Sequence, residues 1–157
     1  MEDLKFTVQA HSENSTKTVV KARGFEIILD EPESLGGTNE GANPVEFMLA
    51  AFCGCINVMG HVIAKEMNFE LRSIKIKMCG NLNPERFMGT SFKQRAGYKG
   101  IDVSIEPDSD APIEILEAWL KNIEDRCPVS DNLSHATPIS LLLKGKFHSL
   151  KKENELV

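Results

Sequence analysis

The sequence predicts an α+β fold, because segments of strand character and of helix character follow one another in groups. Three segments near the N-terminus alternate apolar and polar side chains, as half-buried strands do. One long apolar segment follows, and two more alternating segments, an amphipathic helix and a last strand come after it. This order lacks the regular strand-helix alternation of a parallel sheet, which favours α+β over a βαβ fold. With no internal repeat or linker-like stretch, one domain over residues 1–157 is expected.

The N-terminal strands are expected at residues 4–10, 16–21 and 25–30. Turn-forming residues lie between them, Ser12 to Ser15 in the first gap and Arg23-Gly24 in the second, which predicts an antiparallel meander. A loop over residues 31–42, rich in glycine and acidic residues, then leads into the long apolar segment. This loop lacks the lysine and the strand-to-helix glycine pattern of a phosphate-binding loop.

Residues 44–66 are predicted to form a long helix. Asn43 is suited to cap its first turn, Pro44 fits the first helical position, and Glu46 complements the positive end of the helix dipole. The helix is apolar nearly all round, so we expect it inside a core or against a partner subunit. Its length of about 20 residues would span a bilayer, but polar residues such as Glu46 and His61, and the lack of basic flanking anchors, favour a helix of a soluble protein.

The second half of the chain is expected to begin with two strands, at 71–79 and 101–106, joined by a mobile connection at 80–99. A helix from Pro112 to Arg126 and a helical turn at 129–134 are expected next. A strand at 139–147 and a frayed tail at 151–157 are expected to end the chain. Trp119 and Ile123 are among the apolar residues at helical spacing that define the second helix. This helix ends at Cys127-Pro128, because a residue before proline is biased away from helical dihedral angles.

Charge and composition exclude several partners. The 157 residues include 23 acidic and 18 basic side chains, for a net charge of −5, and no cluster of Lys and Arg is dense enough to track phosphates. Nucleic acid and membranes are therefore not expected partners. Residues 1–5 carry two acids and no apolar segment, which argues against a secretory signal and makes the cytoplasm the expected location.

Four cysteines, Cys53, Cys55, Cys79 and Cys127, are expected to be reduced thiols in that compartment. No C-x-x-C spacing occurs and the histidines are scattered without ligand spacing, so a zinc site is not expected. Cys53 and Cys55 lie about 200° apart around the helix, so only one faces a given pocket. Free cysteine is often simply buried, and that interpretation stays open for both. Cys127 precedes a predicted helical turn whose N–H groups, with the neighbouring Arg126, could stabilise a thiolate.

Several motifs together resemble the OsmC/Ohr family, and the OsmC-like branch more than the organic hydroperoxide resistance proteins proper. They are Arg23-Gly24-Phe25, Asp30-Glu31-Pro32, Leu35-Gly36-Gly37, Gly41, Asn43-Pro44-Val45-Glu46, Ala50-Ala51, Gly54-Cys55, Cys127-Pro128-Val129-Ser130, Leu133 and Thr137-Pro138-Ile139. The match covers nearly the whole chain. Its most specific part is the pair of N-P-x-E ending in G-C and the distant C-P-V-S.

The resemblance implies a thiol-dependent peroxidase for organic hydroperoxides that uses no metal, haem or flavin. Cys55 would be the peroxidatic thiol and Cys127 the resolving thiol, with a cellular dithiol as reductant. The family fold is an intertwined homodimer in which antiparallel sheets pack around two central helices and each active site lies at the subunit interface. In family members an arginine near the N-terminal strands, oriented by a glutamate near the start of the central helix, activates the thiol, and Arg23 and Glu46 occupy the nearest positions.

Two departures from the family pattern concern the activating residues. In the hydroperoxide resistance proteins the glutamate directly follows the proline, whereas here Val45 does, and Glu46 is rotated by about 100° on the helix. Arg23 lies in a motif of the OsmC-like branch rather than in the arginine loop of the peroxidases. Glu46 is equally explained as a dipole partner and Arg23 as a solvated charge. A second hypothesis therefore stays open, a non-catalytic dimer that binds a small apolar ligand or senses oxidation.

Overall fold

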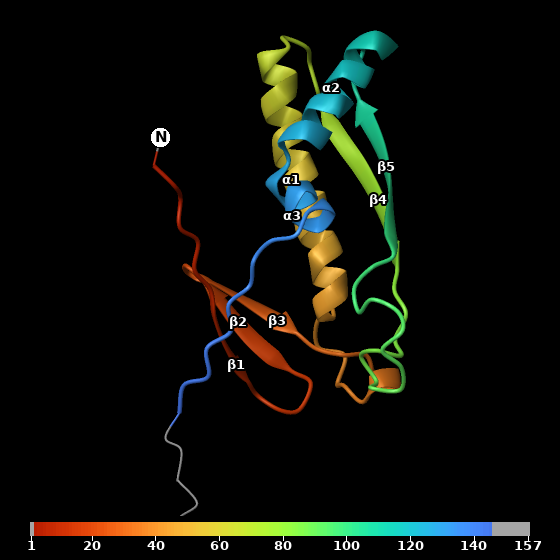
Figure 1. The fold of residues 1–157 in the computed structure, drawn as a ribbon. Coiled ribbons are helices and arrows are strands. Elements are labelled where there is room, and N and C mark those ends of the chain that lie inside the picture. The colour runs from red at the N-terminus through yellow and green to blue at the C-terminus, as the bar shows by residue number, and fades with distance from the viewer. Residues whose placement is uncertain (1, 146–157) are drawn as a thin grey trace, which may run out of the picture.

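The computed structural model describes residues 2–145 and confirms the α+β class (Figure 1). The elements are β1 (Gln9–Ser12), β2 (Thr18–Ala22), β3 (Phe25–Leu29), a short 3-10 helix (Glu33–Leu35), α1 (Pro44–Glu66), β4 (Ser73–Asn81), β5 (Gly100–Asp108), α2 (Ile113–Arg126) and α3 (Pro128–Ser134). The first three strands form one antiparallel sheet, and β4 and β5 pair as a second. In Figure 1 the helices lie beside the β4-β5 sheet, and the N-terminal sheet lies near the lower end of α1.

Helix α1 begins and ends where the sequence predicts. The Asn43 side chain accepts a hydrogen bond from the Glu46 N–H (2.9 Å), and the Glu46 carboxylate accepts one from the Asn43 N–H (2.9 Å). This reciprocal cap satisfies two N–H groups that a helix start leaves without a helical partner. Pro44 occupies the first helical position, where its missing N–H costs nothing. The start of α1 is therefore set by local sequence alone.

The core forms where α2 and the β4-β5 sheet pack on α1. Its buried members are Ile56, Ile63, Ala64, Trp119 and Ile123. The Trp119 indole N–H donates to the Gly60 carbonyl oxygen at 2.8 Å. A Cβ at Gly60 would lie 2.6 Å from Ile74 and 3.0 Å from the Trp119 ring. The close approach of the two helices therefore needs a residue without a side chain at position 60.

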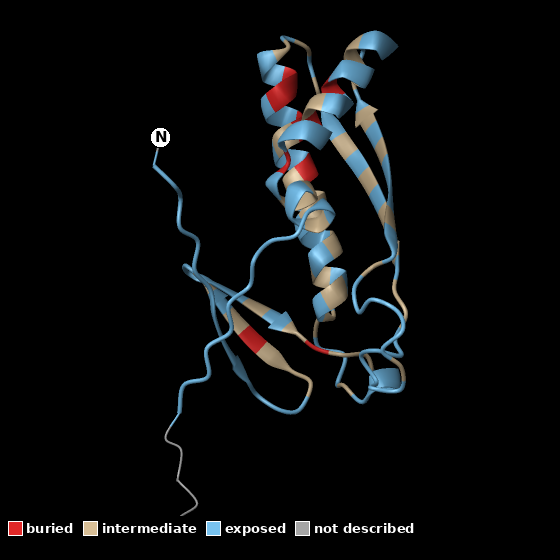
Figure 2. Ribbon diagram, in the orientation of Figure 1, coloured by how far each residue is buried: buried red, intermediate tan, exposed pale blue. Residues whose placement is uncertain are grey.

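Most of the surface of α1 is not covered by the other residues that the structure describes (Figure 2). Only Ile56, Gly60, Ile63 and Ala64 are buried in this helix, and Val58 is 59% exposed. By length and composition α1 could cross a membrane, yet here it packs on α2, α3 and β4 with 22% of its apolar window buried. The expected burial is thus met on one face only, because neighbouring elements of the same chain contact only that face.

Asp30 organises the loop that connects β3 to α1. Its side chain is fully buried. One carboxylate oxygen accepts a hydrogen bond from the Glu31 N–H (2.8 Å), and the other accepts from the Thr38 N–H (3.0 Å), the Thr38 hydroxyl (2.7 Å) and the Glu40 N–H (3.2 Å). These bonds, with that from Thr38 the largest cause, hold the pKa of the Asp30 carboxyl well below its usual range. The loop is therefore folded around a buried negative charge and delivers the chain to Asn43.

The strands predicted at 4–10 and 139–147 are mostly not formed in the described residues. Of residues 4–10, only 9 and 10 belong to a strand, and residues 136–145 form none, although the prediction placed a strand at 139–147. The apolar side chains of both segments are exposed, for example Phe6 at 88% and Leu141 at 93%. A strand needs a neighbour for its N–H and C=O groups, and the described part of the chain offers these segments none. Residues 146–147 and the predicted tail at 151–157 lie outside the described residues.

The buried charge of Asp30 predicts a pH-dependent stability. A free aspartate has a pKa of about 3.9, so a carboxyl with a lower pKa in the folded state stabilises fully above that value and progressively less as the pH falls below it. We expect Asp30→Asn to be less stable at pH 7, with the difference shrinking below about pH 4. Urea denaturation at a series of pH values measures both curves. The control is Asp102→Asn, an exposed carboxylate on β5, and parallel curves for wild type and Asp30→Asn would contradict this account.

Candidate functional site

Two cysteines from distant parts of the sequence meet beside α1. Cys55 lies in the middle of α1 and Cys127 lies between α2 and α3, and their sulfur atoms are 2.8 Å apart. Cys127 is buried with 1% exposure, whereas Cys55 is half-buried. Both are free thiols. The pair is therefore placed for sulfur-to-sulfur chemistry without a large movement of the backbone.

Cys127 owes its position to the junction between two helices. Its N–H donates to the Ile123 carbonyl (3.0 Å) and ends α2, while its extended backbone precedes Pro128, the first residue of α3. The sulfur accepts a hydrogen bond from the Ser130 N–H at 3.4 Å. A side chain at this cap position faces the N–H groups of the first turn. The predicted proximity of Cys127 to free N–H groups is thus present in the structure.

The surroundings of Cys55 oppose its ionisation. Burial raises the pKa of the Cys55 thiol, and the neighbouring Cys127 raises it further. A hydrogen bond from the Val129 N–H acts in the opposite direction but is outweighed. A thiol with a raised pKa is mostly protonated at neutral pH and is a weak nucleophile. Within one chain, Cys55 is therefore positioned but not activated.

The two residues expected to activate the thiol lie elsewhere in the chain. Arg23 adopts φ of 57° in the β2-β3 turn, and its guanidinium lies over the Phe25 ring at 5.1 Å. In Figure 1 this turn is at the end of the N-terminal sheet that points away from α1. One oxygen of Glu46 is used in the cap of α1. Among the described residues neither Arg23 nor Glu46 makes a hydrogen bond to Cys55 or Cys127.

Arg126 and the remaining cysteines do not join the pair either. The Arg126 guanidinium forms two hydrogen bonds to Glu66 at the other end of α1, one of them at 3.0 Å. Cys79 is exposed on β4, as its alternating pattern predicts, and Cys53 is half-buried. Within residues 2–145, no three His, Cys, Asp or Glu side chains are grouped closely enough to hold a metal ion.

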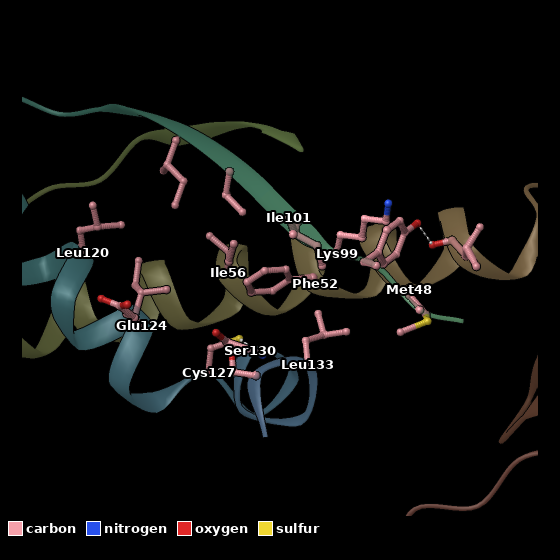
Figure 3. Close-up of a pocket in the computed structure, with 18 of the residues that line it drawn as sticks. Met48, Phe52, Ile56, Lys99, Ile101, Leu120, Glu124, Cys127, Ser130 and Leu133 are labelled. Carbon is pink, nitrogen blue, oxygen red and sulfur yellow. Dashed lines mark hydrogen bonds between the residues drawn. The ribbon is translucent and has the colours of Figure 1, made fainter. Parts of the chain in front are cut away.

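A cavity of about 650 Å³ borders Cys127 (Figure 3). It lies among α1, β5, α2 and α3, and most of its wall is apolar. The apolar residues are Val45, Met48, Phe52, Ile56, Ile101, Val103, Ile105, Leu120, Ile123 and Leu133. Cavities of this size and character accommodate small organic ligands. Cys127 therefore borders a space suited to an apolar molecule, and Cys55, which does not line the cavity, adjoins it through its contact with Cys127.

The cavity also contains residues that the sequence analysis missed. Arg95, Tyr98 and Lys99 line it, from the connection that was expected to be mobile. The Tyr98 hydroxyl donates to the Val45 carbonyl oxygen at 2.8 Å, which ties this connection to the first turn of α1. Burial and, second, the charge of Glu46 raise the pKa of Tyr98. No periodic pattern marks these residues, and the only local signal for them is one tyrosine near two glycines.

Solved structures similar to this fold include proteins of the OsmC/Ohr group. An OsmC-like protein from Mycoplasma pneumoniae is 18% identical, with a TM-score of 0.74 over 85% of this chain and 89% of that one. An organic hydroperoxide resistance protein OsmC from Legionella pneumophila is 16% identical (TM-score 0.61, 85% and 91% covered). A putative organic hydroperoxide resistance protein from Vibrio cholerae, with captopril bound in one of its active sites, is 14% identical (TM-score 0.62, 85% and 86%). At these identities the likeness establishes the fold.

A comparison with curated proteins finds no match. The family model described as OsmC-like protein matches residues 37–142. This range includes α1, the β4-β5 sheet, α2, α3 and both cysteines of the pair. The sequence resemblance and the fold comparison agree with it. The chain therefore belongs to the OsmC-like protein family.

Proposed function

We propose that this protein is a thiol-dependent peroxidase that reduces organic hydroperoxides, with Cys55 as the peroxidatic and Cys127 as the resolving thiol. The observation that carries the proposal is the 2.8 Å separation of the two sulfurs, together with the apolar cavity that Cys127 borders. Neighbours of the same fold named organic hydroperoxide resistance proteins support it. The apolar wall favours a hydroperoxide with a hydrocarbon body.

The proposed reaction has three steps. The Cys55 thiolate attacks the terminal oxygen of the hydroperoxide, the O–O bond breaks, and the departing alkoxide takes a proton to leave as an alcohol, while Cys55 becomes a sulfenic acid. Cys127 then attacks the oxidised sulfur and water departs, which leaves a Cys55 to Cys127 disulfide. A dithiol finally reduces this disulfide by thiol-disulfide exchange and is itself oxidised.

A homodimer is part of the proposal, because one chain leaves large apolar surfaces uncovered. Phe6 is 88% exposed and Leu141 is 93% exposed, both in extended segments without a strand partner in the described chain. The outer face of α1, with Val58 at 59% exposure, is also uncovered. Exposed apolar patches of this kind mark protein interfaces. A second copy would cover them and pair the extended segments.

The dimer would also supply the missing activation of Cys55. Burial raises the pKa of this thiol within one chain, so a cation must approach from outside. We assign this role to Arg23 of a second copy. Glu46 would orient it, since only one oxygen of this carboxylate is used in the α1 cap among the described hydrogen bonds. We place the protein in the cytoplasm, where its four free cysteines would stay reduced.

A second candidate function rests on the same pKa. Burial and Cys127 raise the pKa of Cys55, and a protonated thiol suits a non-catalytic dimer whose cavity binds an apolar molecule or whose thiols sense oxidation slowly. The two functions differ in the rate at which peroxide is consumed.

The first prediction of the peroxidase proposal is catalytic turnover. With dithiothreitol as reductant, the wild-type protein should consume cumene hydroperoxide catalytically, and Cys55→Ser should fall to the rate of dithiothreitol alone. Cys127→Ser should turn over only as fast as dithiothreitol reduces the Cys55 sulfenic acid directly. Loss of residual peroxide over time is the measurement. Cys79→Ser, which removes an exposed thiol on β4, is the control and should keep full activity. A wild-type rate equal to that of Cys55→Ser would favour the binding function.

The second prediction concerns the oxidised intermediate. One equivalent of cumene hydroperoxide should give a Cys55 to Cys127 disulfide, because the sulfurs are already in contact. Mass spectrometry of the peptides should show the linked pair with loss of two hydrogens. Cys127→Ser should instead accumulate a Cys55 sulfenic acid that dimedone traps. A disulfide that includes Cys53 or Cys79 in the wild type would refute the resolving role of Cys127.

The third prediction concerns the homodimer and the effect of Arg23 on the pKa of Cys55. Analytical ultracentrifugation should give the mass of two chains for the wild type and for Arg23→Gln. Removing the cation should raise the pKa of Cys55 by about one unit or more, so iodoacetamide should alkylate Cys55 of the variant more slowly at pH 7 and equally fast at high pH. Lys21→Gln, which neutralises an exposed cation on the same hairpin, is the control. An unchanged pH profile in Arg23→Gln would remove Arg23 from the site.

A further inference from the structure

An ion pair joins the last residue of α2 to the last residue of α1. The Arg126 guanidinium donates two hydrogen bonds to the Glu66 carboxylate, one to each oxygen. These bonds lower the pKa of Glu66 and raise the pKa of Arg126, so both side chains are charged at neutral pH. A pair with two parallel bonds fixes geometry as well as adding energy. Because the two side chains are 39% and 50% exposed, we expect the pair to contribute little to overall stability.

Arg126 and Cys127 are neighbours in the sequence but contact α1 at separate points. Cys127 meets Cys55 in the middle of the helix, whereas Arg126 binds Glu66 at its end. At 1.5 Å per residue, these two points are about 16 Å apart along α1. The ion pair therefore attaches the end of α2 to α1 at a site remote from the sulfurs.

Within the described residues, side-chain hydrogen bonds attach α2 to α1 at two sites. The Trp119 N–H donates to the Gly60 carbonyl oxygen at 2.8 Å near the middle of α2, and Arg126 binds Glu66 at its end. One attachment would let α2 pivot about the indole, whereas two separated attachments fix the direction of the helix. This direction determines where Cys127 lies, because Cys127 directly follows the helix.

The contact between the two thiols cannot hold Cys127 in place throughout the proposed reaction. In the reduced protein the Cys127 sulfur is hydrogen-bonded to the Cys55 sulfur and to the Ser130 N–H. Oxidation of Cys55 to a sulfenic acid places an oxygen on its sulfur, and the contact between two thiols is then lost. Ser130 lies only three residues after Cys127, so its N–H does not attach Cys127 to α1. The attachment through Arg126 is not altered by this oxidation.

We propose that Arg126 and Glu66 are positioning residues that hold Cys127 within reach of the oxidised Cys55. This inference rests on the proposed peroxidase function and concerns its second step. In that step Cys127 gives up its proton and its sulfur attacks the sulfenic sulfur. The S–S bond forms as the S–O bond breaks, and the departing hydroxide takes the proton to leave as water. The ion pair touches neither sulfur and acts only through the location of Cys127.

The test separates the two steps of a single turnover. After one equivalent of cumene hydroperoxide, dimedone added at successive times traps the sulfenic acid, and mass spectrometry measures the trapped acid and the disulfide. In Arg126→Gln and in Glu66→Gln the sulfenic acid should form at the wild-type rate. The disulfide should form about tenfold more slowly, since a misplacement of about 1 Å can cost about 100-fold in rate. Arg126→Gln/Glu66→Gln should be no slower than either single variant, because all three lose the same interaction.

Further variants distinguish the ion pair from a general effect of lost charge. The exchanged pair Arg126→Glu/Glu66→Arg should restore most of the wild-type rate of disulfide formation. Lys121→Gln removes the ion pair with Asp125 at 3.0 Å, which lies within α2 alone, and should keep the wild-type rate. Fluorescence of Trp119, the single tryptophan, should be unchanged in every variant, since its contact with α1 is the point about which α2 pivots. A changed emission would show that the pair holds the whole helix rather than its end, against the inference.

An equilibrium measurement keeps this inference separate from the proposed function. The balance between the Cys55 to Cys127 disulfide and the two thiols, set by mixtures of reduced and oxidised glutathione, requires no peroxide. Holding the thiols together favours the disulfide, so its equilibrium constant should be about tenfold lower in Arg126→Gln than in the wild type. Equal rates of disulfide formation and equal equilibrium constants in the two proteins would overturn the inference. If the wild type does not consume peroxide, the peroxidase proposal fails, and the glutathione equilibrium still decides the role of the ion pair.

Discussion

The close approach of α2 to α1 at Gly60 is the constraint on which the site depends. Because position 60 has no side chain, the Trp119 ring lies against the backbone of α1 and its N–H reaches the Gly60 carbonyl oxygen at 2.8 Å. Cys127 follows Trp119 by two helical turns, so fixing the indole also fixes where α2 ends. The end of α2 therefore lies over the middle of α1, where Cys55 is. A wider spacing between the helices would separate the sulfurs while leaving each helix intact.

The same packing leaves one face of α1 exposed and raises the pKa of the Cys55 thiol. Helix α2 and the β4-β5 sheet cover one face of α1, and this suffices to bury Ile56 and Ile63 but leaves the opposite face open. Burial raises the pKa of Cys55, and among residues 2–145 only the Val129 N–H opposes this effect. Both features concern the same helix. The packing of the described elements on one face of α1 therefore accounts for both features: it leaves the other face exposed, and it buries Cys55 enough to raise the pKa of its thiol.

The sequence predicted those parts of the fold that local chemistry determines. Asn43, Pro44 and Glu46 set the start of α1 through bonds within four residues, and Cys127-Pro128 set the end of α2 in the same way. The strands expected at 4–10 and 139–147 depend on a partner strand, and alternation of side chains cannot say whether the chain supplies one. The family resemblance pointed to Cys55 and Cys127, but their contact depends on Gly60, which no local pattern singles out. Arg95 and Lys99 line the cavity but lie in an irregular connection, which contacts α1 through Tyr98 and has no sequence pattern that predicts this contact.

Burial of the Cys55 thiol disfavours its ionisation when no cation is near and strengthens the stabilisation of the thiolate once a cation lies beside it. Removing water from around Cys55 disfavours the thiolate, which is why its pKa is raised within one chain. The same loss of water lowers the local dielectric, so a positive charge brought beside the sulfur interacts with it several times more strongly than it would in bulk solvent. Under the proposed dimer, the monomer would therefore hold an inert thiol and the assembled protein a reactive one. The position of Cys55 in the middle of an incompletely covered helix then makes reactivity a property of the assembly, without any change in the geometry of the thiol pair.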